Sequence, residues 1–293
     1  MDQPTQADRT GIVVVDKPVG WTSHDVVAKV RRLALQKRVG HAGTLDPLAS
    51  GVLPVLLGRA TRLMELVQSG RKAYRTTVAL GRATGTDDGE GSVIAEAPVP
   101  GLSAATIEGT LAGFRGEILQ TPPPYSALKV DGQRAYVLAR RGESVTLAPR
   151  AVTIDALELL AFSSTELELQ VVCSRGTYIR ALARDVARAL GTVGYMSALR
   201  RTSVGPFSAI EAWSPDQLAA DGLAAHILSA QRVLPEAPLL SLNAGDTRKV
   251  CNGQSIQVDG PLRPGHAWVY DPDGRLLCLG TVDGSLLRPL IQL

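Results

Sequence analysis

The chain has 293 residues, of which 45% are hydrophobic and 20% charged, and its formal net charge is +3 at pH 7. This composition excludes a disordered polar chain and a collagen-like one, and the length fits one large domain or a large domain with a small companion. The three cysteines are far apart and predict neither a disulfide framework nor a CxxC site. Because the sequence has no apolar signal segment and no run of about 18 apolar residues, we expect a cytoplasmic protein without a membrane partner.

Hydrophobic periodicity and turn residues predict a mixture of strands and helices. In chain order we expect a strand at 11–15, a helix after Thr22, a loop at 39–50, an apolar run at 51–57, a helix at 59–68, a strand at 72–80, a helix at 104–111, strands at 152–160 and 166–173, and a helix at 177–190. Thr22 and Asp25 have the spacing of a capping box, which predicts the start of the first helix. Because strands and helices do not alternate strictly, the pattern favours an α+β fold with a mixed or antiparallel central sheet flanked by helices.

Two further segments predict the domain organisation. Residues 120–150 contain three consecutive prolines near their start and carry five basic residues against two acidic ones, so we interpret them as an excursion from the core. The proline-bearing stretch 233–238 is the expected boundary between a domain at 1–232 and a small β-rich domain at 233–293. Within the small domain, residues 271–274 (DPDG) predict a turn between two strands.

Basic residues gather in two stretches although the total charge is small. Between residues 29 and 41 there are five Lys and Arg residues and no acidic one, and between residues 171 and 201 six Arg stand against one Asp. In the second stretch Arg180, Arg184 and Arg188 follow at helical spacing, opposite an apolar face. On spacing alone, a solvated helix face is the simplest interpretation of these three arginines.

Motifs for bound metals and nucleotides are missing from the sequence. The four histidines are widely spaced without an HxxxH or HExxH motif, and neither a phosphate-binding GxxxxGK[ST] loop nor a GxSxG elbow is present. We therefore expect no metal, nucleotide or other cofactor. Residues 81–91 (GRATGTDDGEG) are rich in glycine but lack the lysine of a phosphate loop, so we interpret them as a flexible surface turn.

The segment 41–51 (HAGTLDPLASG) is the best candidate for chemistry. Asp46 lies in an apolar setting between glycines, so we expect the loop to hold its carboxylate away from free solvent. Such an aspartate can act as a nucleophile or a general base. An aspartate that merely caps a turn before Pro47 has the same local pattern, and the pattern alone leaves both interpretations open.

Six segments resemble the bacterial tRNA pseudouridine synthase B family in their order and sequence. They are DKPVGWTSHD (16–25), GHAGTLDPLASGVLP (40–54), KAYR (72–75), YSALK (125–129), SRGTYIRALARD (174–185) and LRRTSVGPF (199–207). The resemblance implies a pseudouridine synthase fold with a thumb insertion at about 120–150 and a small PUA-like RNA-binding domain at its C-terminal end. It also implies that the chain isomerises uridine to pseudouridine at position 55 in the T loop of tRNA, without a cofactor.

The resemblance assigns three catalytic residues. Asp46 matches the essential aspartate, Arg180 matches the arginine that pairs with it, and Tyr74 matches the tyrosine that stacks on the target base and assists deprotonation at C5. A guanidinium can hold a carboxylate through two parallel hydrogen bonds, which suits Arg180 to this role. Asp46 could attack the sugar, attack the base or help to deprotonate C2′, and the sequence leaves all three routes open.

Other residues match the substrate contacts of the family. His41 matches a histidine that helps to extrude the base from its stack, and Tyr178 and Leu199 match residues of the uridine pocket, with plain core packing as the alternative for the latter two. Lys17 lies in the first motif, where a role in supporting the active-site loop is also expected. The expected contacts to RNA are Lys17, Arg31, Arg32, Lys37, Arg38, Lys129, Arg140, Arg141, Arg200 and Arg201.

Three competing functions deserve a test. The chain could bind or fold RNA without catalysis, it could act on an RNA other than tRNA, or it could use Asp46 hydrolytically. The intact catalytic triplet argues against the first, and the complete thumb and short C-terminal part argue against the second. The expected partner is therefore tRNA, bound through its T stem-loop by a monomer without an obligate protein partner.

Overall fold

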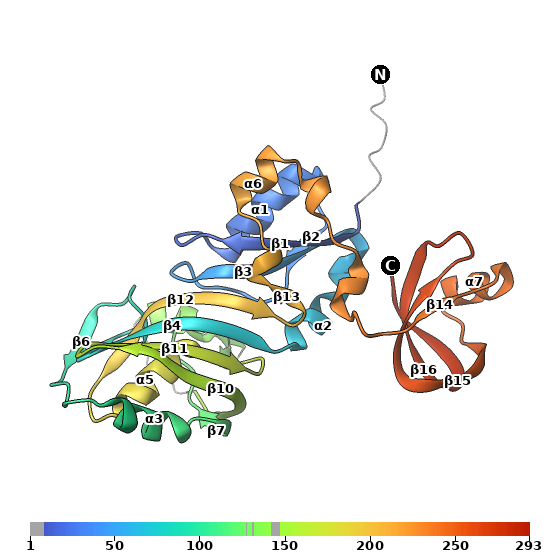
Figure 1. The fold of residues 1–293 in the computed structure, drawn as a ribbon. Coiled ribbons are helices and arrows are strands. Elements are labelled where there is room, and N and C mark those ends of the chain that lie inside the picture. The colour runs from blue at the N-terminus through green and yellow to red at the C-terminus, as the bar shows by residue number, and fades with distance from the viewer. Residues whose placement is uncertain (1–8, 127, 131, 142–146) are drawn as a thin grey trace.

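A curved sheet of nine strands forms the body of the molecule (Figure 1). The computed structural model describes residues 9–126, 128–130, 132–141 and 147–293. The path through the sheet runs β1-β3-β12-β4-β11-β10-β7, with β2 beside β3 and β13 beside β12. The strands are β1 Gly11–Lys17, β2 Val39–His41, β3 Ser50–Leu57, β4 Lys72–Leu80, β7 Gly116–Gln120, β10 Arg150–Phe162, β11 Glu166–Cys173, β12 Gly194–Val204 and β13 Phe207–Ser208. Among the described strands of this sheet, β3 and β12 pair in parallel and the other neighbours are antiparallel, so the expected mixed sheet is confirmed.

Helices pack against two parts of this sheet (Figure 1). The α-helices of the body are α1 Ser23–Ala34, α2 Met64–Ser69, α3 Ala104–Ala112, α5 Ile179–Ala189 and α6 Pro215–Ala220. Short 3₁₀ turns are η1 Gly58–Leu63, η2 Ala209–Glu211, η3 Leu223–His226 and η4 Ala230–Val233. The apolar sides of α3 and α5 share one core cluster with β4, β10, β11 and β12, whereas α1 and α6 share another with β1 and β3. The helix expected at 59–68 is a 3₁₀ turn that continues into the short α2, so this prediction was right only for its second half.

The strand β1 is buried on both faces. Val13 and Val15 pack with α1, while Ile12 and Val14 pack in a second cluster that includes Trp268 of the C-terminal part. A strand that alternates between two apolar environments needs a continuous hydrophobic run. This explains why the sequence GIVVV predicts the strand correctly without any polar alternation.

The start of α1 is fixed by the expected capping box and is tied to the loop before β3. Thr22 Oγ1 accepts a hydrogen bond from the backbone N–H of Asp25, and the Asp25 carboxylate accepts one from the backbone N–H of Thr22 (2.9 Å). The next residue, Ser23, is buried and exchanges two hydrogen bonds with the backbone of Leu45, at 2.9 and 3.1 Å. The helix start therefore positions the segment that carries Asp46.

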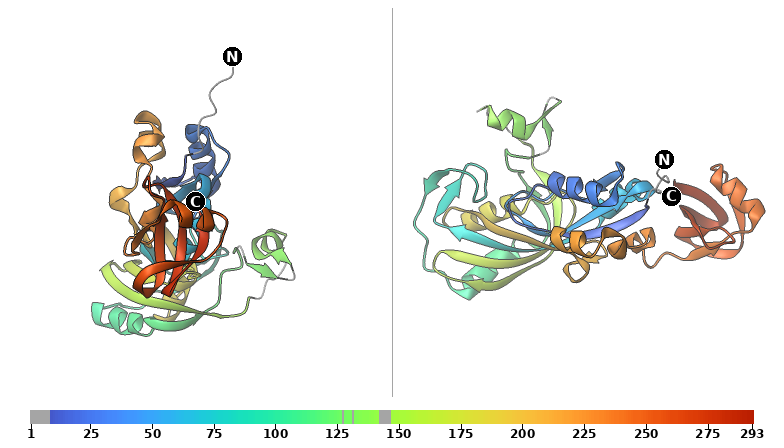
Figure 2. Two further views of the ribbon diagram at one scale, coloured as in Figure 1. Left: turned by 90° about the vertical axis from the view of Figure 1, so that its right-hand side faces the viewer. Right: turned by 90° about the horizontal axis from the view of Figure 1, so that it is seen from above.

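The excursion expected at 120–150 projects from the sheet (Figure 2). Its described elements are the short hairpin of β8 Lys129–Val130 and β9 Gln133–Arg134, followed by α4 Ala135–Arg140. A second hairpin, β5 Arg82–Thr84 and β6 Val93–Glu96, follows β4.

A separate three-stranded sheet forms the C-terminal part (Figure 1). It contains β14 Leu239–Ser241, α7 Ala244–Cys251, β15 Ile256–Tyr270 and β16 Leu276–Gln292, with the expected turn at 271–274 between its two long strands. It has its own core cluster, but Trp268 also packs against the body and donates a hydrogen bond from Nε1 to the Leu234 carbonyl (2.9 Å). We propose a domain boundary between Arg232 and Val233, across a junction that is packed rather than open. Within the described residues, no helix has the length and apolar character needed to cross a membrane.

Candidate active site

Asp46 and Arg180 form an ion pair although 134 residues separate them in the sequence. Asp46 lies in the loop between β2 and β3, and Arg180 is the second residue of α5. The Arg180 Nε lies 3.1 Å from Asp46 Oδ2. The arginine side chain is 8% exposed and the aspartate side chain 38%, so the carboxylate is open to a ligand while the guanidinium is enclosed behind it.

The Arg180 guanidinium is held by two further segments in addition to Asp46. Its Nη1 donates to the Thr86 carbonyl (3.1 Å), its Nη2 donates to the Tyr125 carbonyl (2.9 Å), and Nη1 lies 3.6 Å from Asp88 Oδ2. A buried charge is tolerated where its hydrogen-bonding capacity is met by carbonyls and an opposite charge. The interpretation of Arg180 as part of a solvated face is therefore wrong, and its planar group has one fixed orientation.

Residues 81–91 build one wall of this site, and their interpretation as a flexible surface turn was wrong. The segment starts in β5 and continues into a loop whose Asp88 is only 3% exposed. Asp88 Oδ1 accepts hydrogen bonds from Thr86 Oγ1 and from the Glu90 N–H. Neighbouring Asp87 pairs with Arg184 of α5 at 2.7 Å. A run of acids between glycines normally indicates solvent exposure, and only the tertiary pairing with α5 reveals its role.

Arg201 is buried beneath the Asp46 loop, which corrects its prediction as a contact to RNA. It is 1% exposed and donates from Nε to the Val52 carbonyl (2.7 Å) and from Nη2 to the Gly43 carbonyl (3.0 Å). These two acceptors flank Asp46 in the sequence, so Arg201 ties together both ends of the loop. Gly51 must be glycine here, because its φ is +102° and a Cβ atom would lie 2.1 Å from the Arg201 carbonyl oxygen.

Lys17 is also internal, and the prediction that it contacts RNA was wrong for the same reason. Its side chain is fully buried, and Nζ donates to the carbonyls of Trp21 (2.6 Å), Pro18 (3.0 Å) and Pro47 (3.4 Å). Burial lowers the pKa of Lys17 to about 8, and the nearby Asp46 carboxylate opposes this shift. The geometry fits the expected supporting role, because Pro47 directly follows Asp46.

Tyr74 and Leu199 lie in the same core cluster as Leu45, on the side of the sheet that carries the loop. Tyr74 is 7% exposed and pairs across the sheet with Arg201, while Leu199 pairs with Thr76. Burial raises the pKa of the Tyr74 phenol, and the Arg201 guanidinium beside it opposes the shift. The structure thus places Tyr74 in the same cluster as Leu45 of the Asp46 loop.

His41 and Tyr178 mark two other edges of the site. His41 ends β2, and burial lowers its pKa, with Arg201 adding to the effect. Its Nδ1 is buried and has no hydrogen-bond partner among the described residues. Tyr178 caps α5, and its backbone exchanges hydrogen bonds with the Gln120 side chain at 2.8 and 3.1 Å, which joins the start of α5 to the root of the excursion.

The remaining basic residues are distributed more widely. Arg31, Arg32, Lys37 and Arg38 are exposed around the end of α1, and Arg31 Nη2 donates to the Val39 carbonyl (2.9 Å). Arg200 forms a bidentate pair with Asp16, at 2.8 and 3.0 Å, so part of its charge is already balanced. Arg141 is exposed, whereas the side chains of Lys129 and Arg140 lie outside the described part of the structure. Among the described residues, no group of three or more His, Cys, Asp or Glu could hold a metal ion.

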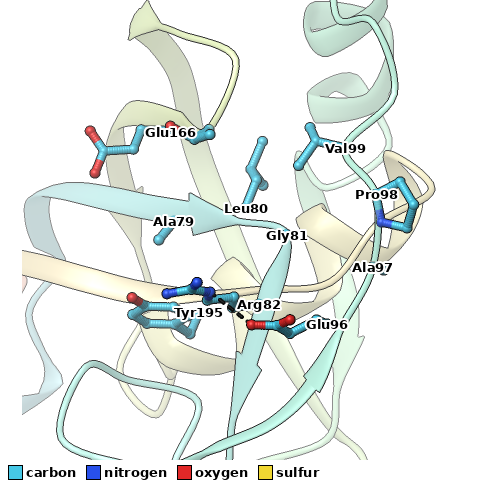
Figure 3. Close-up of a pocket in the computed structure, with 11 residues that line it drawn as sticks. Ala79, Leu80, Gly81, Arg82, Glu96, Ala97, Pro98, Val99, Glu166 and Tyr195 are labelled. Atoms are coloured by element: carbon cyan, nitrogen blue, oxygen red, sulfur yellow. Dashed lines mark ion pairs between the residues drawn. The ribbon is translucent and has the colours of Figure 1, made fainter.

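A cavity of about 590 Å³ lies at the end of β4 that carries Ala79 and Leu80 (Figure 3). It is lined by Ala79, Leu80, Tyr195 and the exposed Arg82–Glu96 ion pair, whose atoms are 3.0 Å apart. At about 3.3 Å per strand residue, Leu80 is roughly 20 Å from Tyr74. None of the predicted site residues lines this cavity, so it is separate from the Asp46–Arg180 pair.

Comparison with known structures defines the class of fold. The chain superposes with a TM-score of 0.70 on a chain of an H/ACA RNP bound to a substrate RNA containing 2′-deoxyuridine, at 23% identity, covering 97% of this chain and 84% of that one. A Cbf5-Nop10-Gar1 complex gives the same TM-score at 24% identity, covering 96% and 83%. The chain therefore shares its fold with these two chains.

Sequence comparison then identifies the family. Residues 31–179 match the N-terminal domain of the TruB family pseudouridylate synthases, and residues 180–234 match the C-terminal domain of tRNA pseudouridylate synthase B. The tRNA pseudouridine synthase B of Thermobifida fusca (strain YX) is 43% identical over 289 residues, covering 96% of this chain and 97% of that protein. The protein of the same name from Mycobacterium tuberculosis (strain ATCC 25618 / H37Rv) is 43% identical over 292 residues, covering 97% and 95%. The chain belongs to the TruB family of pseudouridylate synthases, which confirms the resemblance of its motifs.

Proposed function

We propose that the chain isomerises uridine to pseudouridine at position 55, in the T loop of tRNA. The observation that carries the proposal is the ion pair between Asp46, which is open to a ligand and lies in the part of the chain that matches the family model, and the enclosed Arg180 of α5. The names of the relatives, which are tRNA pseudouridine synthases, support tRNA as the substrate.

The reaction requires three events at one nucleotide. The bond between N1 of the base and C1′ of the ribose breaks, the uracil turns, and a new bond joins C5 to C1′ while C5 loses one proton and N1 gains one. No atom is added and no electron leaves, so a positioned carboxylate and a proton acceptor are sufficient in principle. Asp46 would supply the carboxylate, by attack on the sugar, by attack on the base or through C2′ deprotonation.

Arg180 would orient Asp46 in each of these routes. Its Nε faces the Asp46 carboxylate, while its two Nη atoms are engaged by carbonyls on the opposite side. A guanidinium held in this way cannot turn to follow the substrate, so the carboxylate keeps one direction of approach. Tyr74 would offer a flat apolar surface to the base, with its hydroxyl near C5.

The target base must leave the folded T loop before these groups can act. Extrusion of a base costs a few kcal/mol. We assign this step to His41, whose lowered pKa keeps the ring neutral and able to lie beside an uncharged base. The excursion at 120–150 would close on the RNA as a thumb, and the exposed basic residues at the end of α1 would contact its phosphates.

The same proposal covers partners and location. The protein would act in the cytoplasm as a monomer on tRNA, without an obligate protein partner. The two solved structures with the same fold are assemblies with RNA or with further proteins, as their titles state, and they differ from this chain in more than three-quarters of aligned positions.

The direct test maps pseudouridine in an unmodified tRNA transcript. Purified protein is incubated with the transcript, which is then treated with carbodiimide and read by primer extension. We expect one new stop at the T-loop uridine and its loss with Asp46→Asn, which keeps the shape but loses the carboxylate. Binding of RNA without any stop would contradict the proposal and favour an RNA-binding protein, and a stop in unrelated hairpins but not in the T loop would contradict the proposed substrate.

A further inference from the structure

Arg184 lies one turn after Arg180 on α5, and the proposed reaction assigns it no role. Residues four apart on a helix share one face, so the two arginines face the same neighbours. Only 13% of the Arg184 side chain is exposed, which excludes a solvated helix face for this arginine as well. A guanidinium enclosed to this degree needs partners for its charge and for its N–H groups.

Three partners surround the Arg184 guanidinium. Nη1 lies 2.7 Å from Oδ2 of Asp87, in the loop between β5 and β6. Nη2 donates to the carbonyl of Thr121 (2.9 Å), at the root of the excursion. Nε donates to Oδ1 of Asp185, the next residue of α5, at 2.8 Å. One side chain of α5 therefore binds both a loop that lines the active site and the segment from which the excursion starts.

Arg180 binds the same loop and the same root at neighbouring positions. It donates to the carbonyl of Thr86 (3.1 Å), one residue before Asp87. It also donates to the carbonyl of Tyr125 (2.9 Å), four residues after Thr121. A segment held at one point can pivot about that point, whereas contacts at two points fix its direction. The two arginines together fix the direction of both segments relative to α5.

The backbone of Asp87 explains why the second contact matters for the loop. Its φ is +59°, in the left-handed region that residues other than glycine adopt rarely and at a cost in free energy. The residues on both sides of this turn face Arg180, through the Thr86 carbonyl and the Asp88 carboxylate. The ion pair with Arg184 stabilises the turn, and the turn presents both acceptors to Arg180.

We propose that Arg184 is a positioning residue for the reaction, which fixes the direction of Arg180 through the two segments that both arginines bind. The inference rests on the proposed isomerisation. The path of contacts runs from Arg184 to the loop and the root of the excursion, from these to Arg180, and from Arg180 to Asp46. Arg184 thereby joins the segment that would close on the RNA to the ion pair that would perform the chemistry.

The two carboxylates on Arg184 give a matched pair of variants. Asp87→Asn and Asp185→Asn each remove one charge beside the same guanidinium, but only residue 87 belongs to the loop that faces Arg180. Asparagine also tolerates the left-handed conformation of residue 87. In a single turnover with saturating protein, we expect the rate of pseudouridine formation to fall at least about tenfold with Asp87→Asn and to stay within about twofold with Asp185→Asn. Equal rates in the two variants would overturn the proposal.

Arg184→Gln tests the guanidinium itself, with Arg188→Gln as the control at an exposed residue one turn further along α5. Both variants keep the loop attached to the sheet, because its backbone exchanges two hydrogen bonds of 3.1 Å with Met196 of β12. We expect Arg184→Gln to lower the single-turnover rate between about 10-fold and 100-fold, while the affinity for tRNA stays within about twofold. A loss of affinity at an unchanged rate, or an equal fall in rate in the control, would overturn the proposal.

A double-mutant cycle shows whether Arg184 acts through Arg180. Asp88→Asn alters the loop contact of Arg180 directly, whereas Arg184→Gln alters it through the loop. Two changes with one target are not independent, so we expect the double variant to be within about threefold of the slower single variant. A rate that falls by the product of the two single losses would overturn the proposal, because Arg184 would then act elsewhere.

The proposed function and this inference fail in different ways. If the wild type makes no pseudouridine in tRNA, the proposed reaction falls and the inference falls with it. If the wild type and Arg184→Gln make pseudouridine at the same rate, the proposed reaction stands and only the positioning role of Arg184 falls.

Discussion

The guanidinium of Arg180 lies between two carboxylates, with Asp46 Oδ2 3.1 Å from its Nε and Asp88 Oδ2 3.6 Å from its Nη1. The two acids differ in exposure, because the Asp46 side chain is 38% exposed and the Asp88 side chain 5%. The Asp46 carboxylate can therefore meet a substrate, whereas the buried Asp88 carboxylate contacts only neighbouring groups of the protein, Arg180 among them. Asp88 is a positioning residue in this arrangement.

Replacing Asp88 by Asn tests this role. The amide keeps the size of the side chain but loses the charge that faces Arg180, so the guanidinium gains freedom and Asp46 loses its fixed direction. We expect kcat to fall between about 10-fold and 100-fold, as for a small misplacement of a catalytic group, with KM nearly unchanged. Steady-state kinetics with tRNA as the substrate measure kcat and KM separately.

The matched control for Asp88→Asn is Glu96→Gln in the adjacent strand of the same hairpin. Glu96 pairs with Arg82 on the surface, where both side chains are more than 60% exposed. Exposed pairs contribute little, so kcat should stay within about twofold of the wild type. A similar loss of kcat in both variants would contradict the positioning role of Asp88, because any substitution in the hairpin would then lower kcat.

The conformation of the loop around Asp46 predicts that a substitution at Gly51 strongly destabilises the fold. Its φ of +102° disfavours any side chain, and a Cβ would collide with the Arg201 backbone. Gly176 has a comparable φ of +84° but has open space around the position of a Cβ. We expect Gly176→Ala to destabilise the fold by about 1 kcal/mol through its backbone conformation alone, and Gly51→Ala by at least about 3 kcal/mol. Urea unfolding measures both, and equal losses would contradict the steric argument.

Local signals in the sequence were sufficient for most elements of the fold. The capping box at Thr22 and Asp25, the alternation in β4 and the apolar run of β1 each depend on neighbours within a few residues. The segment 59–68 shows the limit of such signals, because its apolar spacing does not distinguish a 3₁₀ turn from an α-helix.

The burial of the charged side chains of Lys17, Arg201 and Asp88 could not be predicted from local signals in the sequence. Lys17 and Arg201 look like surface residues because a charged side chain is normally exposed, and their acceptors are carbonyls of the Asp46 loop and adjoining segments that only the folded sheet brings near. Asp88 was missed for the same reason. The Asp46–Arg180 pair was found only because the motifs resemble a family, since no spacing rule joins residues so far apart.

Two buried lysines make the free energy of unfolding depend on pH in the alkaline range. Burial lowers the pKa of Lys17 and of Lys72 from 10.5 to about 8. Between pH 8 and 10.5 each lysine binds more protons in the unfolded chain than in the folded one, so it makes the free energy of unfolding rise with pH. Burial raises the pKa values of Cys173 and Cys278, so these two thiols act in the opposite direction.

The contribution of Lys17 is isolated by comparison with Lys17→Met. The difference in unfolding free energy, wild type minus variant, should increase by about 1 kcal/mol per pH unit between pH 8 and 9.5. Urea unfolding at pH 7.5, 8.5 and 9.5 gives this difference, and Lys72→Met should show the same trend. A difference that does not change with pH would mean that Lys17 is not buried as an ammonium group.

Tyr74 combines an apolar ring and a hydroxyl, and two substitutions separate their roles. Tyr74→Phe keeps the ring that would stack on the base and removes the hydroxyl beside Arg201. We expect kcat to fall about 100-fold, in the range of a single proton-transfer group, while the affinity for tRNA stays the same. Tyr74→Leu also removes the aromatic face, so it should weaken binding as well. Full activity of Tyr74→Phe would show that the phenol takes no part in proton transfer, and that Tyr74 serves the site through its ring alone.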